Sequence, residues 1–133
     1  MNQKITVELK ESTTLSIDDA VQRFSNALIE TEQFRNYERA REYYQQDAAA
    51  QKAFREYQIL AQSLQTKQMF NTVTPAERSD MERLWTAFMS NASVAELFNS
   101  QEALQELCRQ CAQEISGHIG LDYATSCGAS CCG

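Results

Sequence analysis

The sequence is poor in the two residues that interrupt helices, with one proline and four glycines among 133 residues. This scarcity favours long α-helices, because proline and glycine are the strongest helix breakers. The chain also lacks an apolar run long enough to cross a bilayer, and its first residues lack the apolar stretch of a signal peptide. These absences predict a cytoplasmic protein.

Recognisable catalytic motifs are absent as well. The single histidine, His118, has no serine, cysteine or aspartate partner in a motif. The sequence contains no glycine-rich phosphate-binding loop and no nucleophile elbow. We therefore do not expect an enzyme, and one histidine excludes most histidine-based metal sites.

The charge balance is acidic, with 12 Lys+Arg against 18 Asp+Glu and a formal net charge of −6. A chain of this charge lacks the basic footprint that binding to nucleic acid or to an anionic membrane requires. The length suits one domain, and 43% hydrophobic residues argue against wholesale disorder. We therefore expect a small folded protein with a protein partner and without direct nucleic-acid or membrane binding.

The hydrophobic periodicity predicts an all-α fold, an elongated antiparallel bundle or hairpin of about five helices. Helix starts are expected at Ser16 with Asp19, at Asp47 ahead of three alanines, and at Thr74-Pro75 with Glu77. Interruptions are expected at residues 31–32, 71–73, 91–93 and 99–100, and the last helix should end at Gly117 to Gly120.

Apolar side chains recur along these helices at the spacing of one helical face. The stripes are narrow, so an elongated hairpin should leave an apolar seam exposed and should self-associate, as a homodimer or as a hetero-oligomer with related subunits. The first two stripes consist of Ile17, Val21, Phe24 and Leu28, and of Phe34, Tyr37, Arg41 and Tyr44.

The two ends of the chain differ from the helical region. Residues 4–10 alternate between apolar and polar, which predicts a short strand within an N-terminal arm, residues 1–15. The helical domain is expected over residues 16–120. Residues 121–133 are small, polar and rich in cysteine, and they are expected to be flexible without a ligand.

Residues 27–40, ALIETEQFRNYERA, resemble the YlbF/YmcA family of small bacterial helical proteins. The resemblance continues through Asp47, the alanine-rich helix start and the stretch FREYQ at residues 54–58, and it covers about residues 17 to 120. It implies an all-α, commonly dimeric protein that regulates rather than catalyses. Relatives act in a complex associated with iron–sulfur clusters, which influences competence, biofilm formation and sporulation through RNA processing.

Cys108 and Cys111 form a C-x-x-C pair on the last long helix, within the apolar stripe between Leu104 and Ile115. Residues three apart share a helix face, so both thiols can reach one metal ion. Buried cysteine also behaves as a small hydrophobe, and core packing is the interpretation that the stripe favours. A thioredoxin-like site would need a βαβ context, which the sequence does not predict.

Cys127, Cys131 and Cys132 have no apolar face to join, so core packing does not explain them. Soft thiolates favour iron–sulfur clusters, zinc or copper(I), and a fourth ligand would come from Cys108, Cys111 or another subunit. Zinc is the main rival to a cluster, since both accept four thiolates. The cysteine-ended tail resembles the cluster-associated branch of the family. The alternatives are a thiol-based zinc or copper carrier, a redox sensor, or an oxidisable tail without a cofactor.

Two further features concern the surface. The charged run at residues 35–42, RNYERARE, predicts a solvated helix face with ion pairs of Glu38 to Arg35 and Arg41. Tyr43 lies off the aromatic stripe of its helix and is a candidate contact residue at a partner surface.

Overall fold

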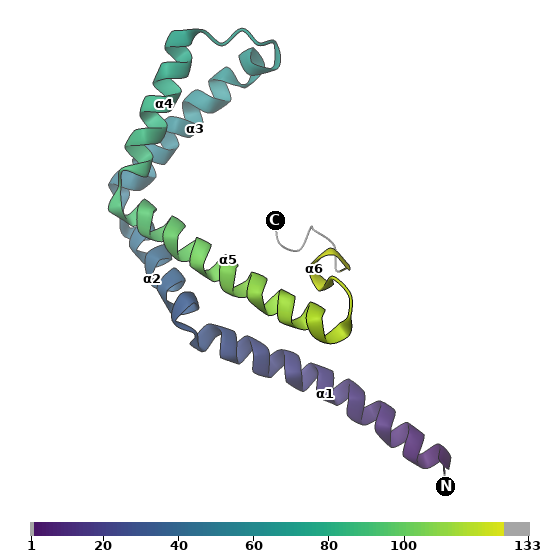
Figure 1. Ribbon diagram of the computed structural model, residues 1–133. Coiled ribbons are helices and arrows are strands. Elements are labelled where there is room, and N and C mark those ends of the chain that lie inside the picture. The colour runs from purple at the N-terminus through teal and green to yellow at the C-terminus, as the bar shows by residue number, and fades with distance from the viewer. Residues whose placement is uncertain (1, 127–133) are drawn as a thin grey trace.

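The computed structural model describes the backbone of residues 2–126 and the side chains of residues 16–126 (Figure 1). The predicted all-α fold is confirmed in this range, where no strand occurs. The elements are α1 (Asn2–Glu30), α2 (Glu32–Gln46), α3 (Ala48–Met69), α4 (Pro75–Met89), α5 (Ala92–Ile119) and the single-turn α6 (Tyr123–Ser126). No helix in the described range is long and apolar enough to cross a membrane.

The helices form two arms that meet at a corner (Figure 1). One arm is the antiparallel hairpin of α3 and α4, and in the other α2 packs antiparallel against α5. The α2–α3 and α4–α5 connections both lie at the corner, whereas α1 extends away from it toward the N-terminus (Figure 1). The fold is therefore elongated rather than spherical.

Local capping bonds explain the interruption that the sequence predicted at residues 31–32 and the helix start that it predicted at Thr74-Pro75. The Thr31 hydroxyl accepts a hydrogen bond from the Phe34 N–H at 3.2 Å and begins α2. Thr74 and Glu77 form the expected reciprocal capping box, in which the Glu77 carboxylate accepts from the Thr74 N–H at 2.9 Å. These bonds satisfy backbone donors that lack partners within the helix.

The prediction of an extended N-terminal segment is wrong. Residues 4–10 belong to α1, which runs without interruption from Asn2 to Glu30, so Ser16 begins no helix. An alternating pattern of seven residues defines a strand only where a neighbouring strand supplies a ladder. No partner strand occurs in the described range, whereas a helix satisfies its own backbone hydrogen bonds and no glycine or proline interrupts it here.

Near the C-terminus the structure confirms one boundary and corrects one expectation. Gly120 ends α5 in the left-handed conformation, with φ 72°. The helix continues through residues 99–100, where an interruption was expected. Residues 123–126 form the single turn α6, where the Ser116 hydroxyl accepts a hydrogen bond from the Tyr123 N–H at 3.0 Å, and residues 127–133 lie outside the described part of the chain.

The most buried apolar cluster lies where the arms meet. It consists of Ala50 from α3, Phe88 from α4 and Val94 from α5, with Tyr44 and Phe54 packed against it. Residues from both arms contribute, so this cluster holds the arms together at the corner.

Candidate protein-interaction interface

An exposed apolar face lies on α1. Ile17, Val21, Phe24 and Leu28 follow each other at intervals of three and four residues and therefore share one side of the helix. Ile17 is 60% exposed, Val21 59% and Phe24 46%, and Leu28 alone is half-buried. We call Ile17, Val21 and Phe24 the α1 face. Spacing of this kind is the pattern by which one helix packs against another.

In the part of α1 whose side chains the structure describes, residues 16–30, the contacts with the rest of the chain lie near the end of the helix. Between residues 16 and 30, every side chain except Leu28 is exposed. At the junction, Arg35 forms an ion pair with Glu30 at 2.5 Å, and the Thr31 hydroxyl donates to the Leu28 carbonyl at 2.6 Å. Helices derive most of their stability from packing of an apolar face, and the apolar side chains of residues 17–24 are available for such packing.

The charged run at residues 35–42 of α2 forms other ion pairs and hydrogen bonds than the predicted ones. Arg35 pairs with Glu30 across the α1–α2 junction instead of with Glu38, and the Arg39 guanidinium donates to the Asn36 side chain. The predicted Glu38–Arg41 pair is not among the ion pairs of the described residues. Tyr43 is exposed, as its position off the aromatic stripe predicted.

The two cysteines of α5 differ in their exposure to solvent. Cys108 is exposed and Cys111 is half-buried, so core packing does not hold for Cys108. Cys108 lies one residue beyond the half-buried Leu107, and a step of one residue rotates a side chain by about 100° around the helix axis.

Cys127, Cys131 and Cys132 lie outside the described residues. Within residues 16–126, no group of three or more histidine, cysteine or acidic side chains is placed to hold a metal ion.

Two carboxylates at helix starts have shifted pKa values. The Ser93 hydroxyl and the Ala50 N–H both donate to Asp47, and these bonds lower the pKa of its carboxyl. A hydrogen bond from Lys67 and one from the Thr74 N–H lower the pKa of Glu77 to about 2. Both pKa shifts come from hydrogen bonds at helix boundaries, so structural roles of the two carboxylates explain them.

The sequence model of a protein family described as control of competence regulator ComK, YlbF/YmcA, matches residues 17–119. The chain belongs to the YlbF/YmcA family. The match confirms the resemblance seen at residues 27–40 and 54–58 and connects the chain with a regulatory role. No curated protein and no solved structure matches the chain. In this family member, the matched region begins at Ile17, the first residue of the α1 face.

The α3–α4 hairpin carries a second exposed surface that sequence analysis missed. Met69 is 78% exposed and Phe70 73%, although both end a predicted amphipathic helix. The sequence did contain a signal for this exposure. Phe70 lies on a different side of the helix from the apolar stripe through Phe54, Tyr57 and Leu64.

Proposed function

We propose that this YlbF/YmcA-family protein is a non-enzymatic, cytoplasmic regulatory adaptor that self-associates and binds a partner protein. The observation that carries the proposal is the exposed α1 face, since every side chain between residues 16 and 30 except Leu28 is exposed. Complete burial of an Ile, Val or Phe side chain is worth about 1.5–3 kcal/mol, so three such residues from each copy provide a substantial driving force. The finer role, in RNA processing or developmental regulation, rests on the family resemblance.

Sedimentation analysis of three proteins tests self-association. The wild-type chain is expected to form a dimer or a hetero-oligomer with a related subunit. Val21→Glu places a charge in the α1 face and should weaken association at least about a hundredfold. Asn26→Glu adds the same charge on the opposite side of α1 and should leave association unchanged. A wild-type chain that stays monomeric and binds no related subunit would refute the proposal.

We also propose that Cys127, Cys131 and Cys132 supply thiolates to an iron–sulfur cluster. Thiolate sulfur is the usual protein ligand of such clusters. A fourth ligand would come from Cys108, Cys111 or another subunit, and the exposure of Cys108 supports its candidacy. Zinc is the competing metal, because it also accepts four thiolates.

Anaerobic purification distinguishes these cofactors. The purified sample is assayed for iron, sulfide and zinc, and its visible absorption spectrum is recorded. A cluster is expected to give a coloured protein with matched amounts of iron and sulfide. Stoichiometric zinc in a colourless protein would replace the cluster by a zinc site, and a metal-free protein would remove the cofactor from the proposal.

A thiol-based zinc or copper carrier, or a redox sensor, is the second candidate function. Replacement of Cys127, Cys131 and Cys132 by serine distinguishes this function from that of the adaptor. The adaptor should retain self-association through the α1 face, whereas a carrier or sensor should lose metal transfer or its redox response.

A further inference from the structure

The α3–α4 hairpin differs in charge from the rest of this acidic chain. Residues 48–91 contain five basic and four acidic side chains, whereas the remaining residues contain seven basic and fourteen acidic ones. The hairpin is therefore the electropositive arm of the molecule.

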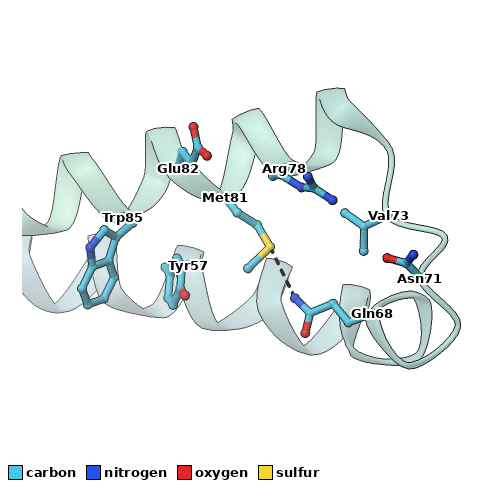
Figure 2. A pocket seen from close by; sticks show the side chains of 8 residues that line it. All are labelled: Tyr57, Gln68, Asn71, Val73, Arg78, Met81, Glu82 and Trp85. Carbon is cyan, nitrogen blue, oxygen red and sulfur yellow. Dashed lines mark hydrogen bonds between the residues drawn. The ribbon is translucent and has the colours of Figure 1, made fainter.

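An open cavity of about 370 Å³ lies between α3 and α4 toward the tip of this arm (Figure 2). Tyr57 from α3 and Met81 and Trp85 from α4 provide its apolar surface, and the Tyr57 and Trp85 ring centroids are 5.2 Å apart. The Gln68 amide contacts the Met81 sulfur at 3.8 Å (Figure 2). We call this cavity the hairpin groove. Its size falls within the range of ligand-binding clefts.

Arg78 provides the groove with an uncompensated positive charge. Its guanidinium is exposed and forms no hydrogen bond or ion pair with any residue in the described range. Figure 2 shows Arg78 directed toward the loop that carries Asn71 and Val73. Glu82 also lines the groove, but its carboxylate points away from α3. The nearby Lys67 is neutralised by Glu77 at 2.5 Å.

Met69 and Phe70 are exposed and stand in the sequence between two groove residues, Gln68 and Asn71, although neither lines the groove itself. Methionine adapts its shape to different partners, and exposed aromatic residues are enriched at protein interfaces. The tip thus offers an apolar surface bordered by one available cation.

We propose that the hairpin groove binds an acidic, apolar segment of a partner protein. An apolar side chain of the partner packs against Tyr57, Met81 and Trp85, and an aspartate or glutamate next to it pairs with Arg78. This site is separate from the α1 face. The proposal rests on the proposed adaptor function and adds to it the chemical class of the partner segment.

Charge and surface favour a protein over a nucleic acid as the occupant. Nucleic-acid binding requires several cations along a phosphate backbone. Arg78 is the one basic residue among those that line the groove, Glu82 lies at its edge, and the whole chain carries a net charge of −6. An apolar surface with one cation matches a peptide with one or two carboxylates.

Selection from a random peptide library on the full-length wild-type protein tests the proposal. Enriched peptides are titrated against wild type, Arg78→Glu and Arg55→Glu, with the fluorescence of Trp85, the single tryptophan, as the readout. Arg55 is the matched control, because it is exposed and unpaired in the described range, lies on the same hairpin and is not among the groove residues. A uridine oligonucleotide is titrated in parallel.

We expect enriched peptides that place Asp or Glu beside Leu, Met or an aromatic residue. Arg78→Glu should weaken their binding at least about tenfold, and Arg55→Glu less than about threefold, since only Arg78 makes a direct ion pair. Enrichment of basic peptides, no enrichment, or equal losses in the two variants would overturn the proposal, as would tighter, Arg78-dependent binding of the oligonucleotide. Val21→Glu should retain peptide binding, which separates this test from that of self-association.

Discussion

The Ser93 hydroxyl donates a hydrogen bond of 2.6 Å to the Asp47 carboxylate, from a position 46 residues further along the chain. Asp47 separates α2 from α3 and accepts a second hydrogen bond, at 3.0 Å, from the Ala50 N–H at the start of α3. Ser93 lies in the first turn of α5 and is completely buried. One carboxylate thus caps a helix and joins the two chain connections at the corner.

Ser93→Ala should lower the free energy of unfolding by about 1–2 kcal/mol, because it removes a buried hydrogen bond to a carboxylate. It should also raise the pKa of Asp47 toward its ordinary value, since the Ser93 bond is the largest cause of the shift. Urea unfolding measures the first effect. Ser63→Ala is the control, because the exposed Ser63 bonds only to the Leu60 carbonyl of its own helix, and an equal loss in both variants would contradict this role of Ser93.

Acid should destabilise the protein partly through Glu77. Its pKa is about 2 in the folded chain, against an ordinary 4.5. A carboxylate with a lowered folded-state pKa stabilises the fold above its ordinary pKa, and this contribution is lost as the pH falls through the folded value. Carboxyl NMR titration should give a pKa of about 2 for Glu77. Lys67→Gln should raise it toward 4.5, and an unchanged pKa would exclude Lys67 as the main cause.

Phe88→Ala should be the most damaging substitution of the corner cluster. The centroid of the Phe88 ring lies 5.1 Å from the ring centroid of Phe54, 5.5 Å from that of Trp85 and 6.4 Å from that of Tyr44. The Phe88 ring therefore contacts both arms. Loss of a buried phenylalanine costs about 3–5 kcal/mol through lost burial and the cavity left behind. Thermal unfolding followed by Trp85 fluorescence measures the change, and Phe88→Leu should cost less because it fills more of the cavity.

Self-association should determine the protection of α1 from hydrogen exchange. The helix has few contacts within its own chain, so its amides should be protected in the assembly and exchange quickly in Val21→Glu. The amides of α3 and α5 should change little, because their packing lies within one chain. Hydrogen exchange read by mass spectrometry makes the comparison, and strong protection of α1 in a monomer would contradict it.

Cys108 should react with a maleimide faster than Cys111, because Cys108 is exposed and Cys111 is half-buried on the inner side of α5. Mass spectrometry of the labelled peptides after short exposure distinguishes the two thiols. Equal labelling would show that α5 does not shield Cys111.

The locally determined features could be predicted because each depends on a few neighbouring residues. Thr31, Asp47, Thr74 and Glu77 cap helices by bonds that span three positions, and Gly120 adopts a conformation that most side chains disfavour. Periodicity predicted the α1 face as a stripe, and the low content of glycine and proline predicted the all-α class. The strand expected at residues 4–10 failed because alternation alone supplies no partner strand.

The sequence by itself therefore determined helices α2 to α5, most of their boundaries and the family. Only the tertiary structure decided how the arms meet, that Cys108 faces solvent and that Tyr57, Met81 and Trp85 form one groove with Arg78. The physical reason is that these features depend on contacts between distant segments. Ser93 and Asp47 show this most directly, since each carries a local signal and their shared hydrogen bond exists only once α5 has returned to the corner.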